Sequence, residues 1–363
     1  MSTTRRRWAF RLGALVGATA LGFLVAEVVV RQRAPEAGAE FLYDAPSAMP
    51  KAMYQDDPEL LQVAAPGFDE TVATFNYRVR VRFNSLGLRG DPKLKGRTWL
   101  ALGDSITMAV QVDEDATFSA ELSKKLGFSV LNAGVDGYST WQATGRYQRL
   151  DPVVNAEGAL LTYFLGNDLA ENHLFPYKLN ERRRGGLPPP PEVRANPLER
   201  LLMQHSALYT YWRIAEKSAR IATGTDPAGQ RFRNELMIFT AGGRQELQNL
   251  TAKSRDALTD FKRAVEARGD RLMVALAPPS FAIDPAVAAA TLAQFGLHDP
   301  APDAPRQAIL GVLQQLAMPT CDLSPPLQEA AAAGGAPFFK YDGHFTAEGH
   351  RVVAAALADC LGS

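Results

Sequence analysis

The sequence predicts an α/β protein: a three-layer, doubly wound (flavodoxin-like) parallel sheet of about five strands, with an N-terminal transmembrane helix and a helical insertion. Two observations lead to this prediction. From residue 98 onward, short apolar runs alternate with longer amphipathic stretches, and strands that alternate with helices form a parallel sheet with helices on both faces. At the N-terminus, a long apolar run follows a cluster of arginines.

The N-terminal segment has the pattern of a membrane anchor. The stretch MSTTRRRWAFR contains four arginines, and the 19 positions of residues 12–30 are apolar except for Glu27. A bilayer needs roughly 20 such positions, and the arginines place the N-terminus in the cytoplasm. We therefore expect residues 1–31 to form a cytoplasmic tip and a single-pass anchor in the cytoplasmic (inner) membrane, with the rest of the chain on the exported side. A signal peptide cleaved after Ala20 and a buried soluble helix are the alternatives.

The segment that follows the anchor lacks a regular pattern. Residues 32–75 are rich in Ala, Pro and Gly without a sustained period, which predicts a linker. Apolar residues then alternate with polar ones over residues 77–83, which predicts a half-buried strand. We expect one domain from residue 76 to residue 363.

The strands of the predicted sheet are apolar runs that end in polar residues or Pro. They lie within residues 98–105, 128–137, 158–168, 270–279 and 317–323. The helices between and after them are expected within residues 113–127, 139–150, 247–269 and 346–361. Acidic residues at the start of the first helix and Gly127 at its end suit helix termini.

A long insertion, roughly residues 172–245, separates the third strand from the fourth. It contains the proline-rich stretch GGLPPPPEV and an amphipathic stretch over residues 196–221, which predicts one helix with an aromatic stripe. Such a stripe favours packing in the core. Because the insertion leaves the sheet directly after a GND turn, a lid over that point is the alternative.

Charge and cysteine content exclude some classes of function. The chain has 363 residues and a formal net charge of zero, so no overall field favours nucleic acid. His and Cys show no zinc-type spacing, and His173 and His205 have no partner at ligand spacing, so we expect no metal and no cofactor. Cys321 and Cys360 either form one disulfide or remain two buried thiols.

Polar residues gather where the predicted strands end, which is where ligands bind in an open parallel sheet. The first strand ends in Gly103-Asp104-Ser105, the second in the stretch NAGVDG of residues 132–137, and the third in Gly166-Asn167-Asp168. The last loop before the final helix contains Asp342-Gly343-His344.

With these blocks the sequence resembles the SGNH, or GDSL, hydrolase superfamily. That superfamily is defined by a Ser in a GDS turn, a Gly, an Asn in a GND turn, and an Asp and a His near the C-terminus. The stretches LGDS, NAGVDG, FLGND and DGHFTAEGH occur here in that order and lie within residues 98–168 and 338–361. The upstream NSLGLRG, together with the N-terminal span, is similar to the membrane-anchored bacterial branch of the superfamily.

The chemistry of these residue types agrees with the resemblance. A serine hydroxyl needs a base to accept its proton, so Ser105 is the expected nucleophile and His344 the expected base. Asp342 would hold the imidazole in the right tautomer. The backbone amides of Ser105 and Gly137 and the side chain of Asn167 are the expected oxyanion-hole donors.

The resemblance implies a serine-dependent esterase or deacylase of the cell envelope that works through an acyl-serine intermediate. Its substrate would be a small acyl ester, a lipid or an acylated carbohydrate. The common family pattern is Asp-x-x-His, whereas Gly343 alone separates Asp342 from His344. Members that resemble alginate O-acetyltransferases use Asp-x-His, so an O-acyltransferase acting on an exported polysaccharide is the alternative. A catalytically silent envelope scaffold is the third possibility.

Four other polar residues near these blocks are expected to have structural roles. Asp104, Asp136 and Asp168 are expected to orient turns. His350 is expected to lie on the final helix as a packing or solvent-facing residue.

Overall fold

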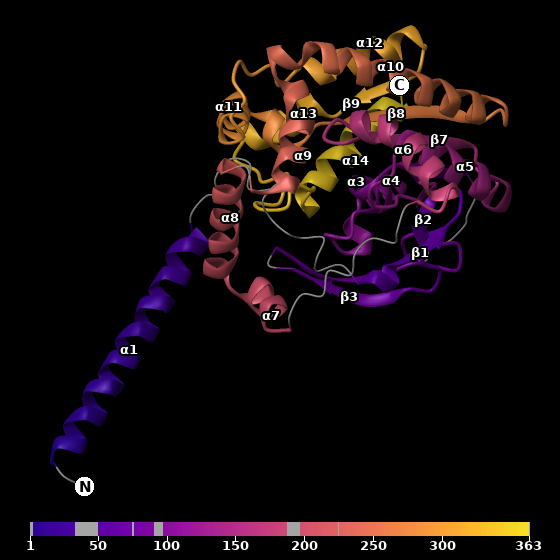
Figure 1. Ribbon diagram of the computed structural model, residues 1–363. Coiled ribbons are helices and arrows are strands. Elements are labelled where there is room, and N and C mark those ends of the chain that lie inside the picture. The colour runs from indigo at the N-terminus through magenta and orange to yellow at the C-terminus, as the bar shows by residue number, and fades with distance from the viewer. Residues whose placement is uncertain are drawn as a thin grey trace.

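Five parallel strands form the central sheet of the computed structural model, which describes residues 3–32, 50–74, 76–90, 97–186, 197–223 and 225–362 (Figure 1). The strands are β5 (Thr98–Leu102), β6 (Ser129–Asn132), β7 (Gly158–Phe164), β8 (Arg271–Ala277) and β9 (Thr320–Asp322). Their order is β6-β5-β7-β8-β9, and every pairing is parallel. This is the flavodoxin-like order, so the predicted fold class is confirmed.

Helices cover both faces of the sheet. One layer contains α4 (Phe118–Leu126), α13 (Ser324–Ala332) and α14 (Ala347–Gly362), and the other contains α5 (Thr140–Val154), α10 (Arg244–Glu266) and α12 (Ala304–Gln315). Along β5, Trp99 and Ala101 pack with the first layer, whereas Leu100 and Leu102 pack with the second. All of β5 is buried, as is usual for a central parallel strand.

The remaining elements connect or extend these layers, and several add buried side chains to the same core. The helices are α3 (Ser105–Met108), α6 (Asp168–Arg183), α7 (Pro197–His205), α8 (Ala207–Ala222), α9 (Pro227–Leu236) and α11 (Pro285–Gln294). Short 3₁₀ turns are η2 (Lys51–Met53), η3 (Glu114–Ala116), η4 (Met237–Phe239), η5 (Ala241–Gly243) and η6 (Ser280–Ile283).

The insertion is helical, but the prediction of one helix over residues 196–221 is wrong. The stretch forms two helices, α7 and α8, which are separated at Ser206. The Ser206 hydroxyl accepts a hydrogen bond from the Tyr209 amide at 3.1 Å and caps α8, so a side chain that competes with the backbone starts a new helix here. The aromatic stripe does not pack as one unit either, because Trp212 is 55% exposed. Residues 187–196, with most of the proline-rich stretch, lie outside the described residues.

The linker expected over residues 32–75 is too long. Residues 33–49 lie outside the described residues, but two antiparallel hairpins follow them. The first pairs β1 (Tyr54–Asp57) with β2 (Leu61–Ala64), and the second pairs β3 (Asp69–Ala73) with β4 (Arg78–Arg82). Their buried side chains, among them Met53, Leu60 and Val81, form a separate small core with Val135 and Tyr138. β4 is the half-buried strand predicted over residues 77–83, and its burial alternates as expected. The other three strands have four or five residues with many exposed or half-buried positions and produce no clear alternation.

The N-terminal helix α1 (Thr3–Gln32) projects away from the rest of the chain (Figure 1). Within the described residues it is the one helix long and apolar enough to cross a membrane, over Arg7–Gln32. Its central apolar side chains are exposed; Leu15, Val16 and Leu21, for example, are each more than 60% exposed. Large apolar side chains exposed on every side are typical of a helix whose solvent is lipid.

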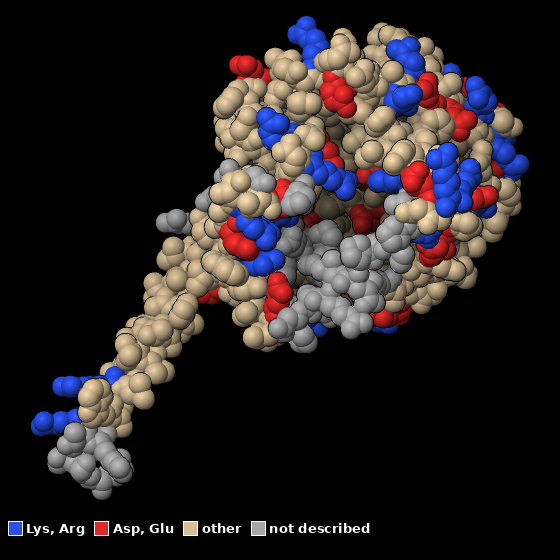
Figure 2. Space-filling view, viewed as in Figure 1, with Lys and Arg blue, Asp and Glu red and all other residues tan. Residues whose placement is uncertain are grey.

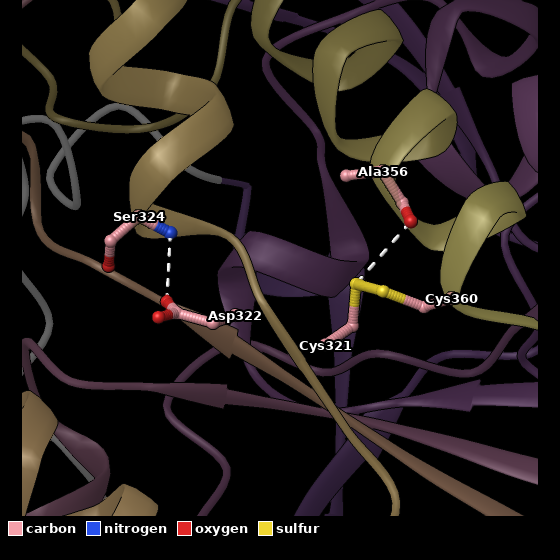
Figure 3. The surroundings of a disulfide bond; sticks show 5 residues. All are labelled: Cys321, Asp322, Ser324, Ala356 and Cys360. Carbon is pink, nitrogen blue, oxygen red and sulfur yellow. Dashed lines mark hydrogen bonds between the residues drawn. A yellow bond between two sulfur atoms is a disulfide. The ribbon is translucent and has the colours of Figure 1, made fainter.

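A disulfide between Cys321 and Cys360 joins β9 to the last turn of α14 (Figure 3). Of the two possibilities left open by the sequence, the structure shows the covalent bond. The bond fastens the C-terminal helix to the edge of the sheet across 39 residues. The segment that it encloses includes the loop with Asp342 and His344.

Removal of this disulfide is expected to destabilise the domain. Closing a loop of this length restricts the unfolded chain, which corresponds to about 2–4 kcal/mol of unfolding free energy. The double variant Cys321→Ala/Cys360→Ala is therefore expected to unfold at lower denaturant concentration, as followed by tryptophan fluorescence. Reductant should lower the wild-type midpoint to a similar degree and leave the variant unchanged. Equal midpoints for wild type and variant would contradict the expectation.

Candidate active site

The carboxyl end of β5 leads into a tight turn that places Ser105 at the start of α3. Gly103 adopts φ +144°, and a Cβ atom there would lie 2.8 Å from the Thr162 carbonyl oxygen, so only glycine fits. The Asp104 carboxylate accepts a hydrogen bond from the Ile106 amide at 2.9 Å and caps α3. The turn thus presents the Ser105 side chain at the edge of the sheet.

Ser105, His344 and Asp342 lie in one hydrogen-bonded chain. The Nε2 atom of His344 is 2.8 Å from Oγ of Ser105, although 239 residues separate them. The Nδ1 atom of His344 hydrogen-bonds to Oδ1 of Asp342. A carboxylate only accepts, so Nδ1 carries a proton. In the neutral ring, the form that acts as a base, Nε2 then accepts from the Ser105 hydroxyl; below the pKa of His344 both ring nitrogens carry protons.

The short Asp-x-His spacing depends on a tight turn in the last loop. Gly343 lies in the left-handed region with φ +76°, and the Phe339 amide donates to the His344 carbonyl at 2.8 Å. Phe338 and Phe345 form an isolated bridge that closes the loop. The single residue Gly343, in this conformation, is enough to turn the side chains of Asp342 and His344 toward each other.

His350 supports the same loop from α14. It is buried, and its Nδ1 accepts a hydrogen bond from the Phe118 amide at 3.2 Å. Its ring also stacks on Phe118 and meets Phe345 edge-on. Burial lowers the pKa of His350 to about 3, so it stays neutral. Of the two roles expected from the sequence, packing and facing the solvent, it has the packing role.

Several carboxylates shape the electrostatics around His344. Burial alone would lower the pKa of His344, but the Asp342 carboxylate, with Asp104 and Asp136 nearby, raises it to about 9. Burial raises the pKa of Asp104 to about 6 against the hydrogen bond from the Ile106 amide. Burial also raises the pKa of Asp136. The site therefore favours the imidazolium form once His344 accepts a proton.

The expected oxyanion donors follow three adjacent strands, β5, β6 and β7. Ser105 begins α3, and Gly137 lies exposed in the loop after β6 with φ +69°. Asn167 precedes α6, and its Nδ2 donates to Oδ2 of Asp104 at 3.1 Å. This hydrogen bond fixes the orientation of the amide and connects the ends of β5 and β7.

Two residues that hold the Gly137 loop were not predicted, because they lie in the expected linker. Gln62 of β2 donates through Nε2 to the Asp136 carbonyl at 2.8 Å, and its own carbonyl accepts from the Tyr138 hydroxyl at 2.8 Å. The Tyr54 hydroxyl donates to Oδ2 of Asp136 at 3.3 Å. Nothing in the sequence around Tyr54 and Gln62 marks them for this role.

The stretch NSLGLRG supports the other side of the turn. The side chain of Arg89 is buried and donates to the carbonyls of Met108 at 3.4 Å and Val112 at 2.7 Å, just after α3. The guanidinium thus fixes the backbone that follows Ser105. The sequence analysis identified the NSLGLRG motif, but the contact of Arg89 with the carbonyls of Met108 and Val112 could not be predicted from it.

The face shown in Figure 2 is hollowed in the region of α3 and α14, with acidic side chains in the hollow and basic side chains at its rim.

Residues 237–362 match a family model described as an SGNH hydrolase-like domain, acetyltransferase AlgX. This match assigns an SGNH hydrolase-like domain to the C-terminal part of the chain. It puts the protein in the broad class of acyl esterases and acyltransferases.

Solved structures give only distant similarity to this chain. A lipolytic protein of the G-D-S-L family from Desulfitobacterium hafniense is 11% identical, with 73% of this chain and 99% of that chain covered and a TM-score of 0.38. The acetylxylan esterase Axe2 from Geobacillus stearothermophilus is 12% identical, with coverage of 74% and 95% and a TM-score of 0.38. No curated protein matches.

The other polar residues considered in the sequence support a turn or lie on helices. The Asp168 carboxylate accepts a hydrogen bond from the Phe164 amide at 2.7 Å and closes the GND turn, and burial raises its pKa. His173 lies on α6, and His205 ends α7. Within the described part of the chain, no cluster of three or more His, Cys, Asp or Glu side chains could hold a metal ion.

The pKa of His344 gives a direct test of this geometry. In protein labelled with ¹³C-histidine, His344 is expected to titrate near pH 9 and to become protonated as the pH falls below that value. The variant Asp342→Asn removes the facing negative charge, so its His344 is expected to titrate at lower pH. His350, with a pKa of about 3, should stay neutral throughout and serves as an internal control. Titration of His344 at the same pH in both proteins would contradict the electrostatic account.

Proposed function

We propose that this SGNH protein is a serine-dependent esterase or deacylase of the cell envelope that works through an acyl-serine intermediate. The observation that supports the proposal most strongly is the chain from Ser105 Oγ to His344 Nε2, at 2.8 Å, and from His344 Nδ1 to Asp342. A nucleophile, a base within hydrogen-bond reach and a group that orients the base are the three parts that acyl transfer to serine requires.

In the first half-reaction, the Ser105 oxygen attacks the ester carbonyl carbon while His344 Nε2 takes the hydroxyl proton. Asp342, hydrogen-bonded to Nδ1, stabilises the imidazolium. The tetrahedral intermediate then expels the alcohol, which receives the proton from His344, and the acyl group stays on Ser105. In the second half-reaction, water attacks the acyl-serine, and His344 accepts its proton and returns it to Ser105 as the acid leaves.

The oxyanion of each tetrahedral intermediate would be bound by the amides of Ser105 and Gly137 and by Nδ2 of Asn167. The Asn167 amide has two N–H hydrogens, and the hydrogen bond to Asp104 uses one. The second can donate to the oxyanion. Because Asp104 holds the amide beforehand, the donor needs little reorganisation during the reaction.

Acyl transfer to a carbohydrate is the second candidate function. Two observations favour it: the Asp-x-His spacing at residues 342–344 and the family model, whose description names an acetyltransferase. The first half-reaction would be the same, and a sugar hydroxyl would replace water in the second. Product analysis with an aryl acetate donor and an oligosaccharide acceptor separates the two. Acetylated sugar supports transfer, whereas acetate alone with acceptor present supports hydrolysis.

We further propose that residues 1–31 anchor the protein in the cytoplasmic membrane, with the catalytic domain on the exported side. The domain would begin near residue 50 rather than residue 76, because the two hairpins pack against the Gly137 loop. The arginines before the span support this orientation. The disulfide Cys321–Cys360 also suits an exported domain, since disulfides persist in oxidising compartments.

Replacement of the nucleophile is the first test. Ser105→Ala is expected to lower kcat/KM for hydrolysis of short-chain aryl esters by about 10⁴- to 10⁶-fold, measured with full-length protein in detergent. The matched variant Ser218→Ala changes a serine of α8 and should keep wild-type activity. Activity of Ser105→Ala near that of the wild type would overturn the mechanism, and an inactive wild type would favour the scaffold alternative.

Replacement of the side-chain oxyanion donor is expected to affect the chemical step. Asn167→Asp keeps the size of the side chain but cannot donate when ionised, and Asn167→Ala removes the group. Both are expected to lower kcat by about 10²- to 10³-fold with a smaller change in KM. Thermal unfolding of each variant shows whether the fold is intact. A folded variant with kcat close to wild type would exclude Asn167 from the oxyanion hole.

A further inference from the structure

The C-terminal part of α1 is hydrogen-bonded, through Glu27, to the start of α8. The Glu27 carboxylate accepts from the backbone amides of Ala207 at 2.8 Å and Leu208 at 3.0 Å, and from the Ser206 hydroxyl at 2.9 Å. A carboxylate at a helix N-terminus satisfies amides that have no partner within the helix. The first turn of α8 is therefore fixed to α1 at Glu27.

The end of α7 is bound to the same turn of α1. Arg31 forms an ion pair with Glu27 at 2.7 Å and donates to the carbonyl of His205, the last residue of α7, at 2.6 Å. We call residues 197–212, which comprise α7, Ser206 and the first turns of α8, the α7–α8 elbow. Figure 1 shows α8 beside the C-terminal end of α1, with α7 following on from the start of α8.

The length of the apolar segment decides where this junction lies relative to a bilayer. The uncharged stretch between Arg11 and Glu27 is residues 12–26, and at 1.5 Å per residue it spans about 22 Å. The hydrocarbon core is about 30 Å thick. A short span draws its polar flanks toward the lipid, so in the proposed anchor Glu27 and the elbow bound to it would lie at the headgroup level.

The elbow exposes the kind of surface that suits this level. Leu198 and Leu201, three residues apart on α7, are 60% and 52% exposed, and Trp212 is 55% exposed. Tyr209 lies beside Trp212, with ring centroids 5.6 Å apart. Trp and Tyr are enriched at membrane interfaces, and amphipathic helices place Leu in the headgroup boundary.

We propose that the α7–α8 elbow is a membrane-surface contact that seats the catalytic domain on lipid headgroups beside its own anchor. The partner is a lipid surface, because the elbow is continuous with the segment that enters the bilayer. This inference rests on the proposed membrane anchor but not on the proposed catalytic activity. Its consequence is a domain held close to the membrane at a fixed orientation, which favours substrates presented near that surface.

Spin-label accessibility in the full-length protein tests the proposal. Leu201→Cys is labelled in nanodiscs that hold one chain, in a bilayer of phosphatidylethanolamine and phosphatidylglycerol. The two native cysteines are joined to each other, so the new thiol is the reactive one. Val153→Cys on α5 is the matched control, because Val153 is 60% exposed but is remote in sequence from the elbow. Val16→Cys on α1 reports whether the anchor is inserted.

The expected result is a label at residue 201 that oxygen reaches several-fold more readily, relative to a water-soluble nickel chelate, than the label at residue 153. If the ratio of oxygen to nickel-chelate accessibility is equal at residues 201 and 153, and the label at residue 16 is exposed to lipid, the membrane contact of the elbow is overturned and the membrane anchor is retained. A water-exposed label at residue 16 would overturn the anchor and the proposal together. A third outcome points to a second copy of the chain. In discs with one chain the nickel chelate would reach the label at residue 201, and in discs with two chains the spectrum of that label would be broadened by a neighbouring spin. Together these results would show that a second copy, and not lipid, covers the elbow. Ester hydrolysis, measured separately, does not enter these outcomes.

Discussion

The buried carboxylate of Asp104 is the interaction on which the rest of the site depends. One of its oxygens caps α3 through the Ile106 amide, and the other accepts from the Asn167 side chain. It thus joins the turn that presents Ser105 to the turn that presents Asn167, the proposed side-chain oxyanion donor. Burial raises its pKa to about 6, which is the cost of keeping a charge inside the edge of the sheet. A buried carboxylate destabilises the fold unless it is hydrogen-bonded, and a fully hydrogen-bonded one fixes the orientation of its partners.

Long-range packing brings the other half of the site to this turn. The loop with Asp342 and His344 is 239 residues from Ser105, so nothing local holds the two together. α14 packs against α4, His350 binds the Phe118 amide, and the disulfide fastens the end of α14 to β9. These contacts, made far from the reacting atoms, set the distance between Nε2 and Oγ.

The fold was predictable from the sequence because its strands are buried on both faces and its helices are amphipathic. Ser105, Asn167, Asp342 and His344 could be named because each stands at the end of a strand or just before the last helix. The positions of Tyr54 and Gln62 could not be predicted. Their hairpins are short and partly exposed, so local patterns give little signal, and only tertiary contacts with the Gly137 loop give them a role.

Two further features depended on information that a linear pattern lacks. The break between α7 and α8 arises from Ser206 and from Glu27, a residue almost 180 positions away whose carboxylate caps α8. The pairing of Cys321 with Cys360 depended on α14 reaching the edge of the sheet. In both cases the local sequence allowed more than one outcome, and a distant partner selected one.

Covalent labelling of the nucleophile tests the central claim most directly. A fluorophosphonate reacts with a serine only when a neighbouring base activates the hydroxyl and donors bind the phosphoryl oxygen. Mass spectrometry of the treated full-length protein is expected to show one adduct, located on the peptide that contains Ser105, with a much slower reaction in His344→Ala. An unlabelled wild-type protein, or equal labelling of Ser105 with and without the imidazole, would contradict the account.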